Sequence, residues 1–345
     1  MKKKAPHIAA LTLLLLSPFF GASASILGTA GDFALLGGTA ITSSGTVGTV
    51  IQNGNVGLSP AATTNITGFP PAVIQNGAII PTGSTTANAR LDLIKAQAGI
   101  AAMPSDTNLS NVDLGGLTLA PGVYKFAAAA NQTGALVLDA QGRNGVFWVF
   151  QIGTTLTTTL SSTVTVINPG SNGGSDIGIF WNCGSAINVA ANNEIAGIYL
   201  SGTSVVFGVN STRGGRVFAL AGITLDNNQF DARGGPGGGD YSGGLMFDSS
   251  GMVVPIATGV SFKYFGKHRR STHSASRPVK GDATSATIVQ WRTHGRKWHT
   301  VSVQANGNWA LKVRSLTLGK NKVSLRAMSA VGSFSDVKKL VIVRL

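Results

Sequence analysis

Carboxylates and histidines are scarce in this sequence. Its 345 residues include 13 Asp and Glu together, and Glu194 is the single Glu. After His7, no histidine occurs before His268. Enzymes that cleave polysaccharides on strand-rich folds need clustered carboxylates, usually beside a base. Isolated Asp residues next to Asn, such as Asp226, are typical of turns. The composition therefore predicts no enzyme, no metal site and no cofactor.

Cysteine is almost absent as well. Cys183 is the only one in the chain, so an intrachain disulfide is excluded and the fold must be held by burial and hydrogen bonds. Because Cys183 lies in the apolar segment Phe180-Trp-Asn-Cys, we expect a small buried side chain and not a reactive thiol.

Long apolar runs are missing except at the N-terminus. Lys2, Lys3 and Lys4 precede an apolar stretch over residues 11–20, and Ala22-Ser-Ala24 follows it. This order is typical of a secretory signal with its cleavage site. A transmembrane helix needs about 20 apolar residues, more than this run supplies. We predict a signal peptide at 1–24, no transmembrane segment, and a secreted, extracellular protein that can associate with the cell surface.

Charge divides the chain into two unlike parts. Residues 25–250 carry 7 Lys and Arg against 11 Asp and Glu, a net charge of −4, whereas residues 251–345 carry 17 against 2, a net charge of +15. A partner of a basic surface should therefore be sought at the C-terminal end. The predicted organisation is a first domain at 25–248, a basic Gly- and Ser-rich linker at 249–278 and a second domain at 279–345. The early part of the linker, residues 253–265, can still form a strand.

Short alternating apolar segments fill the middle of the first domain. They include residues 145–151, 177–182 and 216–225, separated by Gly, Asn and Ser clusters. This pattern predicts strands. Two architectures fit, a sandwich or barrel of hairpins and a solenoid whose coils add short strands to parallel sheets. The solenoid is favoured because two-residue hairpin turns are nearly absent, although the repeats are too degenerate to fix a period.

One helix is predicted in this domain, near residues 86–103. Thr85 or Thr86 can cap it and Pro104 ends it. A face at helical spacing is formed by Leu91, Ile94, Ala98 and Ala101. We expect this face to cover apolar surface on the strand-rich body.

The first domain also contains eight short motifs in a fixed order. They are Leu27-Gly-Thr-Ala, Gly57-Leu-Ser-Pro, Thr67-Gly-Phe-Pro-Pro, Leu114-Gly-Gly-Leu-Thr-Leu-Ala-Pro-Gly-Val-Tyr, Leu138-Asp-Ala-Gln-Gly, Val149-Phe-Gln-Ile-Gly-Thr-Thr-Leu, Ile179-Phe-Trp and Gly215-Arg-Val-Phe-Ala-Leu-Ala-Gly-Ile-Thr-Leu-Asp-Asn-Asn. Together they make residues 26–231 resemble the microbial ice-binding (antifreeze) protein family. The resemblance implies a discontinuous right-handed β-solenoid with an α-helix alongside, which adsorbs to ice through one flat face.

Position in the family pattern also points to ice-binding residues. The resemblance implies Thr39, Thr42, Thr64, Thr67, Thr203, Ser204, Gly222 and Thr224. Thr39-Ala-Ile-Thr42 and Thr82-Gly-Ser-Thr85 fit a Thr-(Ala/Gly)-x-(Thr/Asn) pattern that some members carry on this face. After Thr203 the sequence departs from the family, because Val205-Val-Phe-Gly-Val with Thr212-Arg213 replaces a more Thr-rich coil. A charge or a bulky ring on the face would weaken ice binding.

The second domain is also predicted to consist of strands. Alternating segments follow from residue 287 on, and Asn306-Gly307 marks a hairpin turn. Gly307-Asn-Trp and residues 318–327 resemble a small bacterial immunoglobulin-like β-sandwich. His294 and His299 beside Trp298 are expected to be surface residues and not metal ligands.

Three function classes follow, with ice binding first. A cell-surface adhesin or matrix protein that does not act on ice is the alternative. A polysaccharide enzyme is third and requires carboxylates that are distant in sequence to converge. The predicted partners are an ice crystal surface and an anionic cell-envelope polymer on the basic C-terminal domain, with no specific nucleic acid. Lys and Arg that only keep this domain soluble are the competing explanation of its charge.

Overall fold

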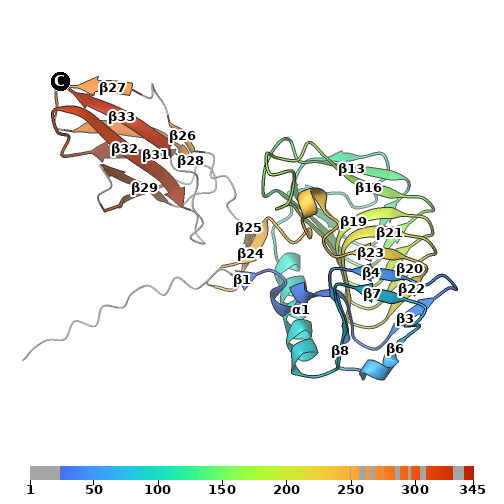
Figure 1. The fold of residues 1–345 in the computed structure, drawn as a ribbon. Coiled ribbons are helices and arrows are strands. Elements are labelled where there is room, and N and C mark those ends of the chain that lie inside the picture. The colour runs from blue at the N-terminus through green and yellow to red at the C-terminus, as the bar shows by residue number, and fades with distance from the viewer. Residues whose placement is uncertain are drawn as a thin grey trace, which may run out of the picture.

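The computed structural model describes residues 24–248, 250–255, 262–264, 269–274, 276–283, 288–293, 297–303, 308–328 and 338–345. The predicted signal peptide lies outside these residues except for Ala24, which pairs with Phe247. Two hydrophobic cores are present, one for the region up to Val253 and one from Val279 on. Figure 1 shows the corresponding strand-rich bodies.

The first body is a β-solenoid of parallel strands, which confirms the favoured architecture. A 15-stranded sheet covers two of its sides. One side consists of β9 (Thr107–Asn108), β11 (Gly122–Phe126), β14 (Phe147–Ile152), β17 (Gly178–Cys183), β19 (Glu194–Ser201), β21 (Thr212–Ala219), β2 (Phe33–Gly37), β5 (Asn55–Leu58) and β8 (Ile79–Ile80). The other side consists of β10 (Thr118–Leu119), β13 (Ala135–Asp139), β16 (Thr163–Ile167), the first residues of β19 and β21, β23 (Gln229–Asp231), β4 (Val50–Gln52) and β7 (Val73–Gln75).

A separate seven-stranded sheet forms the third side. In spatial order it contains β12 (Ala130–Gln132), β15 (Leu156–Thr158), β18 (Ile187–Val189), β20 (Val205–Phe207), β22 (Ile223–Asp226), β3 (Ile41–Ser44) and β6 (Ile66–Thr67). All six pairings are parallel. The coil length varies from 31 residues between Thr157 and Asn188 to 18 between Asn188 and Val206. This variation explains why no repeat period is visible in the sequence.

The coils do not stack in chain order. The first strands of the chain, β2, β3 and β4, pair with β21, β22 and β23 from its far end. Arg216 of β21 lies at this junction, where it donates to the carbonyl of Phe33 at 2.9 Å and to Asp240 at 3.0 Å. The solenoid is therefore discontinuous, as the family resemblance implied.

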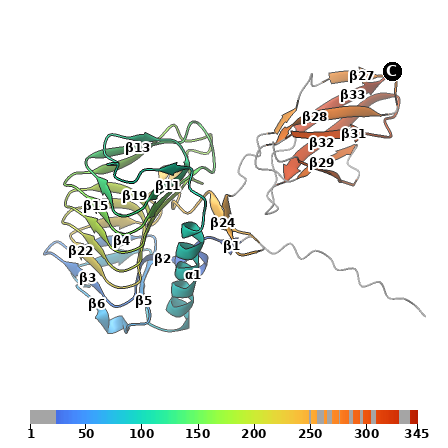
Figure 2. The same ribbon diagram turned by 180° about the vertical axis from the view of Figure 1, so that it is seen from behind.

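Helix α1 (Ser84–Ala101) connects the two sets of coils, because it carries the chain from one end of the solenoid toward the other (Figure 2). Near its start, Arg90 donates to the carbonyls of Ser59 and Leu220. Near its end, Gln151 of β14 donates to the carbonyls of Ile100 and Met103. At about 1.5 Å per residue, the 18 residues span about 27 Å. The chain thus begins its second set of coils at the opposite end and builds back toward the first.

The buried face of α1 differs from the predicted one. Leu91 and Ile94 are 64% and 41% exposed, and Ala98 and Ala101 are exposed too. The residues that pack on the solenoid are Thr86, Ala89, Leu93, Ala96 and Ile100. Their small alanines let the helix approach the sheet closely enough for Gln151 and Asn182 to reach its carbonyls. Close packing on the sheet therefore decided between two faces that are both at helical spacing, because bonds to backbone carbonyls do not depend on the side chains of the helix.

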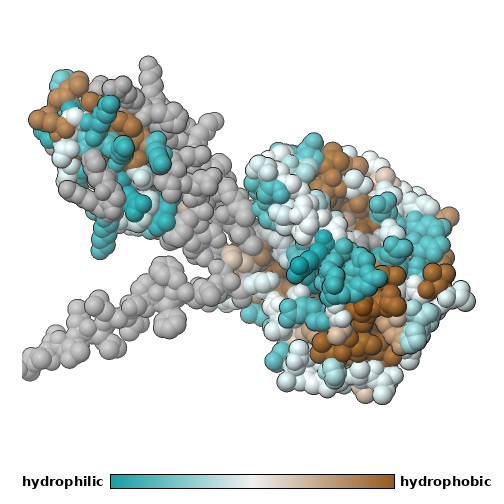
Figure 3. Space-filling view, viewed as in Figure 1, coloured by the Kyte–Doolittle hydropathy of each residue, from teal (hydrophilic) through white to brown (hydrophobic). Residues whose placement is uncertain are grey.

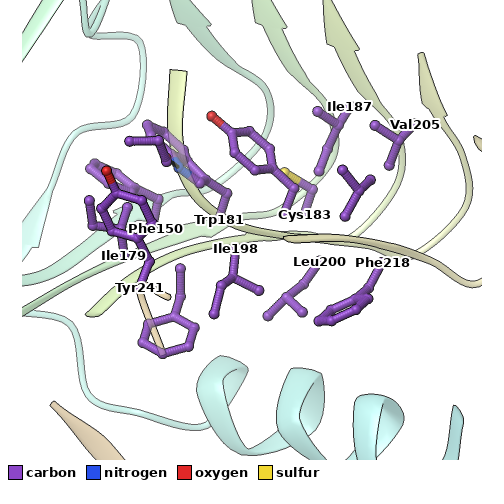
Figure 4. Packing of buried hydrophobic residues seen from close by; sticks show 14 of the residues in the cluster. Phe150, Ile179, Trp181, Cys183, Ile187, Ile198, Leu200, Val205, Phe218 and Tyr241 are labelled. Atoms are coloured by element: carbon purple, nitrogen blue, oxygen red, sulfur yellow. Dashed lines mark hydrogen bonds between the residues drawn. The ribbon is translucent and has the colours of Figure 1, made fainter. Parts of the chain in front are cut away.

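The sheet beneath α1 is buried on both sides. Ile198, Leu200 and Phe218 point toward the helix, whereas Trp181 and Cys183 point into the solenoid (Figure 4). Cys183 is 1% exposed, and burial raises the pKa of its thiol well above the ordinary value. This confirms the expectation of an inert, buried cysteine.

Short elements complete the first body. They are the 3₁₀ helices η1 (Gly28–Asp32), η2 (Thr63–Asn65) and η3 (Pro236–Gly238), and a small antiparallel sheet of β1 (Ala24–Ser25), β24 (Leu245–Phe247) and β25 (Val253–Pro255). Phe247 and Val253 of this sheet belong to the solenoid core.

The C-terminal strands form two sheets around one core. A three-stranded sheet contains β26 (Phe262–Tyr264), β28 (Arg277–Ala283) and β31 (Asn308–Val313). A five-stranded sheet contains β27 (Arg269–Thr272), β33 (Lys338–Arg344), β32 (Gly319–Met328), β29 (Ile288–Thr293) and β30 (His299–Ser302). Strands β26 and β27 lie within the segment expected to be a linker. The immunoglobulin-like assignment and the domain boundaries stay predictions, and Asn306-Gly307 lies outside the described residues.

Candidate functional site

The outer surface of the seven-stranded sheet carries a regular row of exposed side chains. Each strand turns its second residue outward, and its first residue is buried except for the half-buried Ile66 of β6. We call the outward set the strand row. In spatial order it is Asn131, Thr157, Asn188, Val206, Thr224, Thr42 and Thr67. Each of these residues stands directly opposite the next, so the row has no register shift.

A second row runs beside the first, three residues earlier in each coil. This corner row contains Ala128, Thr154, Ser185, Thr203, Ala221, Thr39 and Thr64. Backbone bonds join its members from Ala128 to Thr39 into a ladder, for example from Ser185 N to Thr154 O at 2.9 Å and from Thr203 N to Ser185 O at 3.0 Å, whereas Thr64 lies in the 3₁₀ helix η2. The corner residues are exposed or half-buried.

The two rows form a rigid grid without charge. Parallel strands repeat about every 4.8 Å, so seven strands extend the grid over about 29 Å. None of the fourteen row residues is ionisable. Beneath the strand row, Leu156, Ile187 and Val205 are completely buried. Thr67 donates a hydroxyl hydrogen bond to Thr42 at 3.3 Å, which fixes two neighbouring side chains. The grid is therefore held by the solenoid core.

The structure places six of the eight predicted site residues in these rows. Thr42, Thr67 and Thr224 are in the strand row, and Thr39, Thr64 and Thr203 are in the corner row. The remaining two, Ser204 and Gly222, lie between the rows and are half-buried. Their carbonyls accept ladder bonds from Ile187 and Val205. Ser204 and Gly222 therefore take part mainly in backbone pairing between coils and expose little side-chain surface.

Sequence reasoning did not name eight of the row residues. These are Ala128, Asn131, Thr154, Thr157, Ser185, Asn188, Val206 and Ala221. Their common signal is a small residue or Thr followed three positions later by Thr, Asn or Val, with an aliphatic residue between in all but the first coil. The pattern is short and unevenly spaced along the chain, so it emerges only when the strand pairing aligns the coils.

Two expectations about this face are wrong. Thr82-Gly-Ser-Thr85 is not on it, because Thr85 belongs to α1 and Thr82 donates to the carbonyl of Ala61. Thr212-Arg213 begins β21 in the 15-stranded sheet, so this segment does not belong to the seven-stranded sheet that carries the rows. The departure that remains is Val206, which is 40% exposed at the centre of the strand row.

The neighbouring side of the solenoid has a different chemistry. Figure 3 shows strongly hydrophilic and hydrophobic areas close together over β23, β4 and β7. A cavity of about 390 Å³ on this side is lined by Glu194, Gln229, Asp231 and Tyr241 among others. Asp231 accepts from the side chain of Asn53 and the backbone of Arg233, as expected of a turn residue. Within the described residues, no three His, Cys, Asp or Glu side chains gather into a metal-binding group.

Comparison with known proteins identifies the solenoid. A model of the ice-binding-like family matches residues 35–231. This chain belongs to that family. An ice-binding protein from Nostoc sp. (strain HG1) is 37% identical over 210 residues, which cover 60% of this chain and 74% of the relative.

Solved structures of ice-binding proteins share the fold. One from the Antarctic ascomycete Antarctomyces psychrotrophicus has a TM-score of 0.53 at 30% identity, over 59% of this chain and 95% of that one. An ice-binding protein domain from Shewanella frigidimarina has a TM-score of 0.53 at 29% identity, over 60% and 97%. The resemblance seen in the sequence is thereby confirmed. The family match ends at residue 231, before the C-terminal strands.

The solenoid of this family member also contains an ion pair between the buried Arg216 and the partly exposed Asp240 that makes its stability depend on pH. Burial of Asp240 opposes its ionisation, but the bonds from Ser242 and the charge of Arg216 outweigh it and lower the pKa of the carboxyl below its ordinary 3.8. A lowered pKa stabilises the fold above about pH 4, and this stabilisation is lost as the pH falls through the folded-state value.

We therefore expect the melting temperature of the solenoid to be insensitive to this pair from about pH 5 to 9 and to fall below pH 4. Asp240→Asn should cost about 1–2 kcal/mol at pH 7, after allowance for the 35% exposure of the Asp240 side chain. Calorimetry of the wild-type chain and of Asp240→Asn at several pH values measures the melting temperature and the free-energy cost of the substitution. Destabilisation by this substitution that stays constant as the pH falls from 7 to well below 3.8 would contradict the assignment, because the contribution of the Asp240 charge is lost as the pH falls through its lowered pKa.

Proposed function

We propose that this protein binds ice through the strand row and the corner row of the seven-stranded sheet. The observation that supports this most is the unbroken register of seven uncharged side chains, six of them Thr or Asn, over a largely buried aliphatic layer. Ice presents ordered water and no charge. Thr is suited to such a surface because its stiff β-branched side chain offers both a methyl and a hydroxyl and loses little freedom on binding. The ice-binding names of the relatives agree with it.

Binding of this kind requires adsorption and no chemical step. We therefore propose that the protein is not an enzyme, that it is exported by its N-terminal segment, and that it acts on ice outside the cell. The test is direct observation of a single ice crystal in a solution of the purified full chain during slow cooling. Faceted or arrested growth is expected, and round discs that grow freely would contradict ice binding.

Val206 gives a test of increased activity. It interrupts the strand row between Asn188 and Thr224, and Thr has nearly the same shape as Val. Val206→Thr should raise thermal hysteresis at equal protein concentration, because it extends the run of hydroxyl and amide groups across the centre. Since the side chain is 40% exposed, stability should change by no more than about 0.5 kcal/mol. Unchanged or lower hysteresis in a folded variant would count against the row as the binding surface.

A second proposal concerns the C-terminal half. Its net charge of +15 over residues 251–345 attracts polyanions over distances up to about 10 Å at moderate salt. We propose that it binds an anionic polymer of the cell envelope and so holds the ice-binding solenoid near the cell. Retention of the full chain on such a polymer should weaken as salt rises.

A further inference from the structure

Four cationic side chains surround one serine on the outer face of the five-stranded sheet. Ser324 of β32 stands opposite Arg292 of β29 on one side and Lys339 of β33 on the other. Lys322 and Arg326 are two residues away along β32 itself. We call these five residues the cationic cluster.

All members of the cluster point to the same side of the sheet. Val323, Leu325 and Leu340 point into the core and are at most 1% exposed. Since side chains alternate along a strand, Lys322, Ser324, Arg326 and Lys339 point outward. Arg292 stands directly opposite Ser324 and so shares its face. Opposite pairs are about 5 Å apart and next-but-one neighbours about 7 Å, so the four cationic side chains all start within about 7 Å of Ser324 on one face.

The arginines of the cluster are held in place by neighbouring groups. Both guanidinium carbons lie over the ring of Trp298, at 4.4 Å for Arg292 and 4.3 Å for Arg326. The Nε of Arg326 also donates to Gln290 at 2.9 Å. Positioned guanidinium groups lose less freedom when they bind an oxyanion than mobile ones do.

The sequence of this half is poor in acidic residues. Beyond residue 250 the sequence contains two acidic residues, Asp282 and Asp336. Asp282 belongs to β28 of the other sheet, and Asp336 lies outside the described residues. Burial and the nearby charge of Arg292 lower the pKa of Arg326. Like charges opposite one another on a sheet are unfavourable, and an external oxyanion would relieve that repulsion.

We propose that the cationic cluster binds the carboxylate groups of an anionic polysaccharide. This rests on the proposal that the basic half has a polyanionic partner, and it names the surface and the polymer. Guanidinium groups pair with carboxylates through two parallel bonds, and the hydroxyl of Ser324 can add a third contact. Single-stranded nucleic acid is disfavoured because it needs open aromatic faces for base stacking, whereas the ring of Trp298 already has both guanidiniums against it.

The experiment uses the full chain with polygalacturonate as the probe and its methyl ester as the uncharged control polymer. Binding is measured by calorimetry at low and physiological salt. Arg292→Gln with Arg326→Gln should weaken polygalacturonate binding on the order of tenfold. Lys322→Gln with Lys339→Gln, which leaves the contacts to Trp298 intact, should weaken it in the same direction.

The matched control removes the same charge from the other sheet. Lys280 and Lys312 are exposed on β28 and β31, and Lys280→Gln with Lys312→Gln should change affinity by less than about twofold. Equal losses from the control and cluster variants would overturn the site but leave a diffuse polyanion interaction. Tighter binding to a DNA oligonucleotide of equal charge would overturn the choice of polysaccharide. If the wild-type chain bound no polyanion, this site and the proposed envelope partner would both fall, while ice binding would stand.

Discussion

Thr224→Tyr is expected to remove most of the thermal hysteresis of this protein while leaving it folded. Thr224 stands between Val206 and Thr42 in the strand row, so a phenol ring there would project from the middle of the grid and hold the ice lattice away from its neighbours. The site is exposed, so the free energy of unfolding should change by about 0.5 kcal/mol or less. Thr42→Tyr, one coil further, should have the same effect.

The control for this experiment is Thr165→Tyr. Thr165 is also an exposed threonine in the middle of a strand, β16, but it belongs to the 15-stranded sheet on another side of the solenoid. It should keep wild-type hysteresis. Full activity in Thr224→Tyr, or an equal loss in Thr165→Tyr, would show that ice is bound elsewhere. Chemical denaturation of each variant separates a lost surface from a lost fold.

The largest expected effect on stability comes from Trp181→Ala. Trp181 is completely buried, stacks on Phe150 at a ring distance of 4.0 Å and on Tyr199 at 5.6 Å, and donates its indole hydrogen to the carbonyl of Ala196. Truncation leaves a cavity inside the coil stack, and comparable substitutions cost about 3–5 kcal/mol. Unfolding in urea should therefore have a clearly lower midpoint.

Trp181→Phe is the matched control because it keeps an aromatic ring in the stack. Its cost should be clearly smaller than that of Trp181→Ala, since less volume is lost. At temperatures where Trp181→Ala is still folded, its ice activity should be retained, because the rows lie on a different sheet. A cost below about 1 kcal/mol would mean that the coil stack relaxes around the loss.

Several properties of this protein were determined by the sequence alone. The single cysteine excluded an intrachain disulfide, and the apolar context of Cys183 indicated burial. Gly-rich punctuation without hairpin turns favoured a solenoid over a sandwich. The ordered motifs indicated the ice-binding family, and the position of Thr42 and Thr224 within that pattern predicted them as site residues. These inferences depend on local chemistry or on motif order, both of which a sequence contains directly.

Other properties were decided only by the tertiary structure. Parallel strand pairing brings Asn131, Thr157 and Asn188 into one row with Thr42. The coils that carry these residues differ in length, so no sequence period reveals the alignment. The buried face of α1 was decided by the close packing of small residues such as Ala89 and Ala96 on strands that are distant in sequence. The cationic cluster likewise exists because strand pairing brings Arg292 and Lys339 to either side of Ser324. In each case the deciding interaction joins residues that the chain order keeps apart.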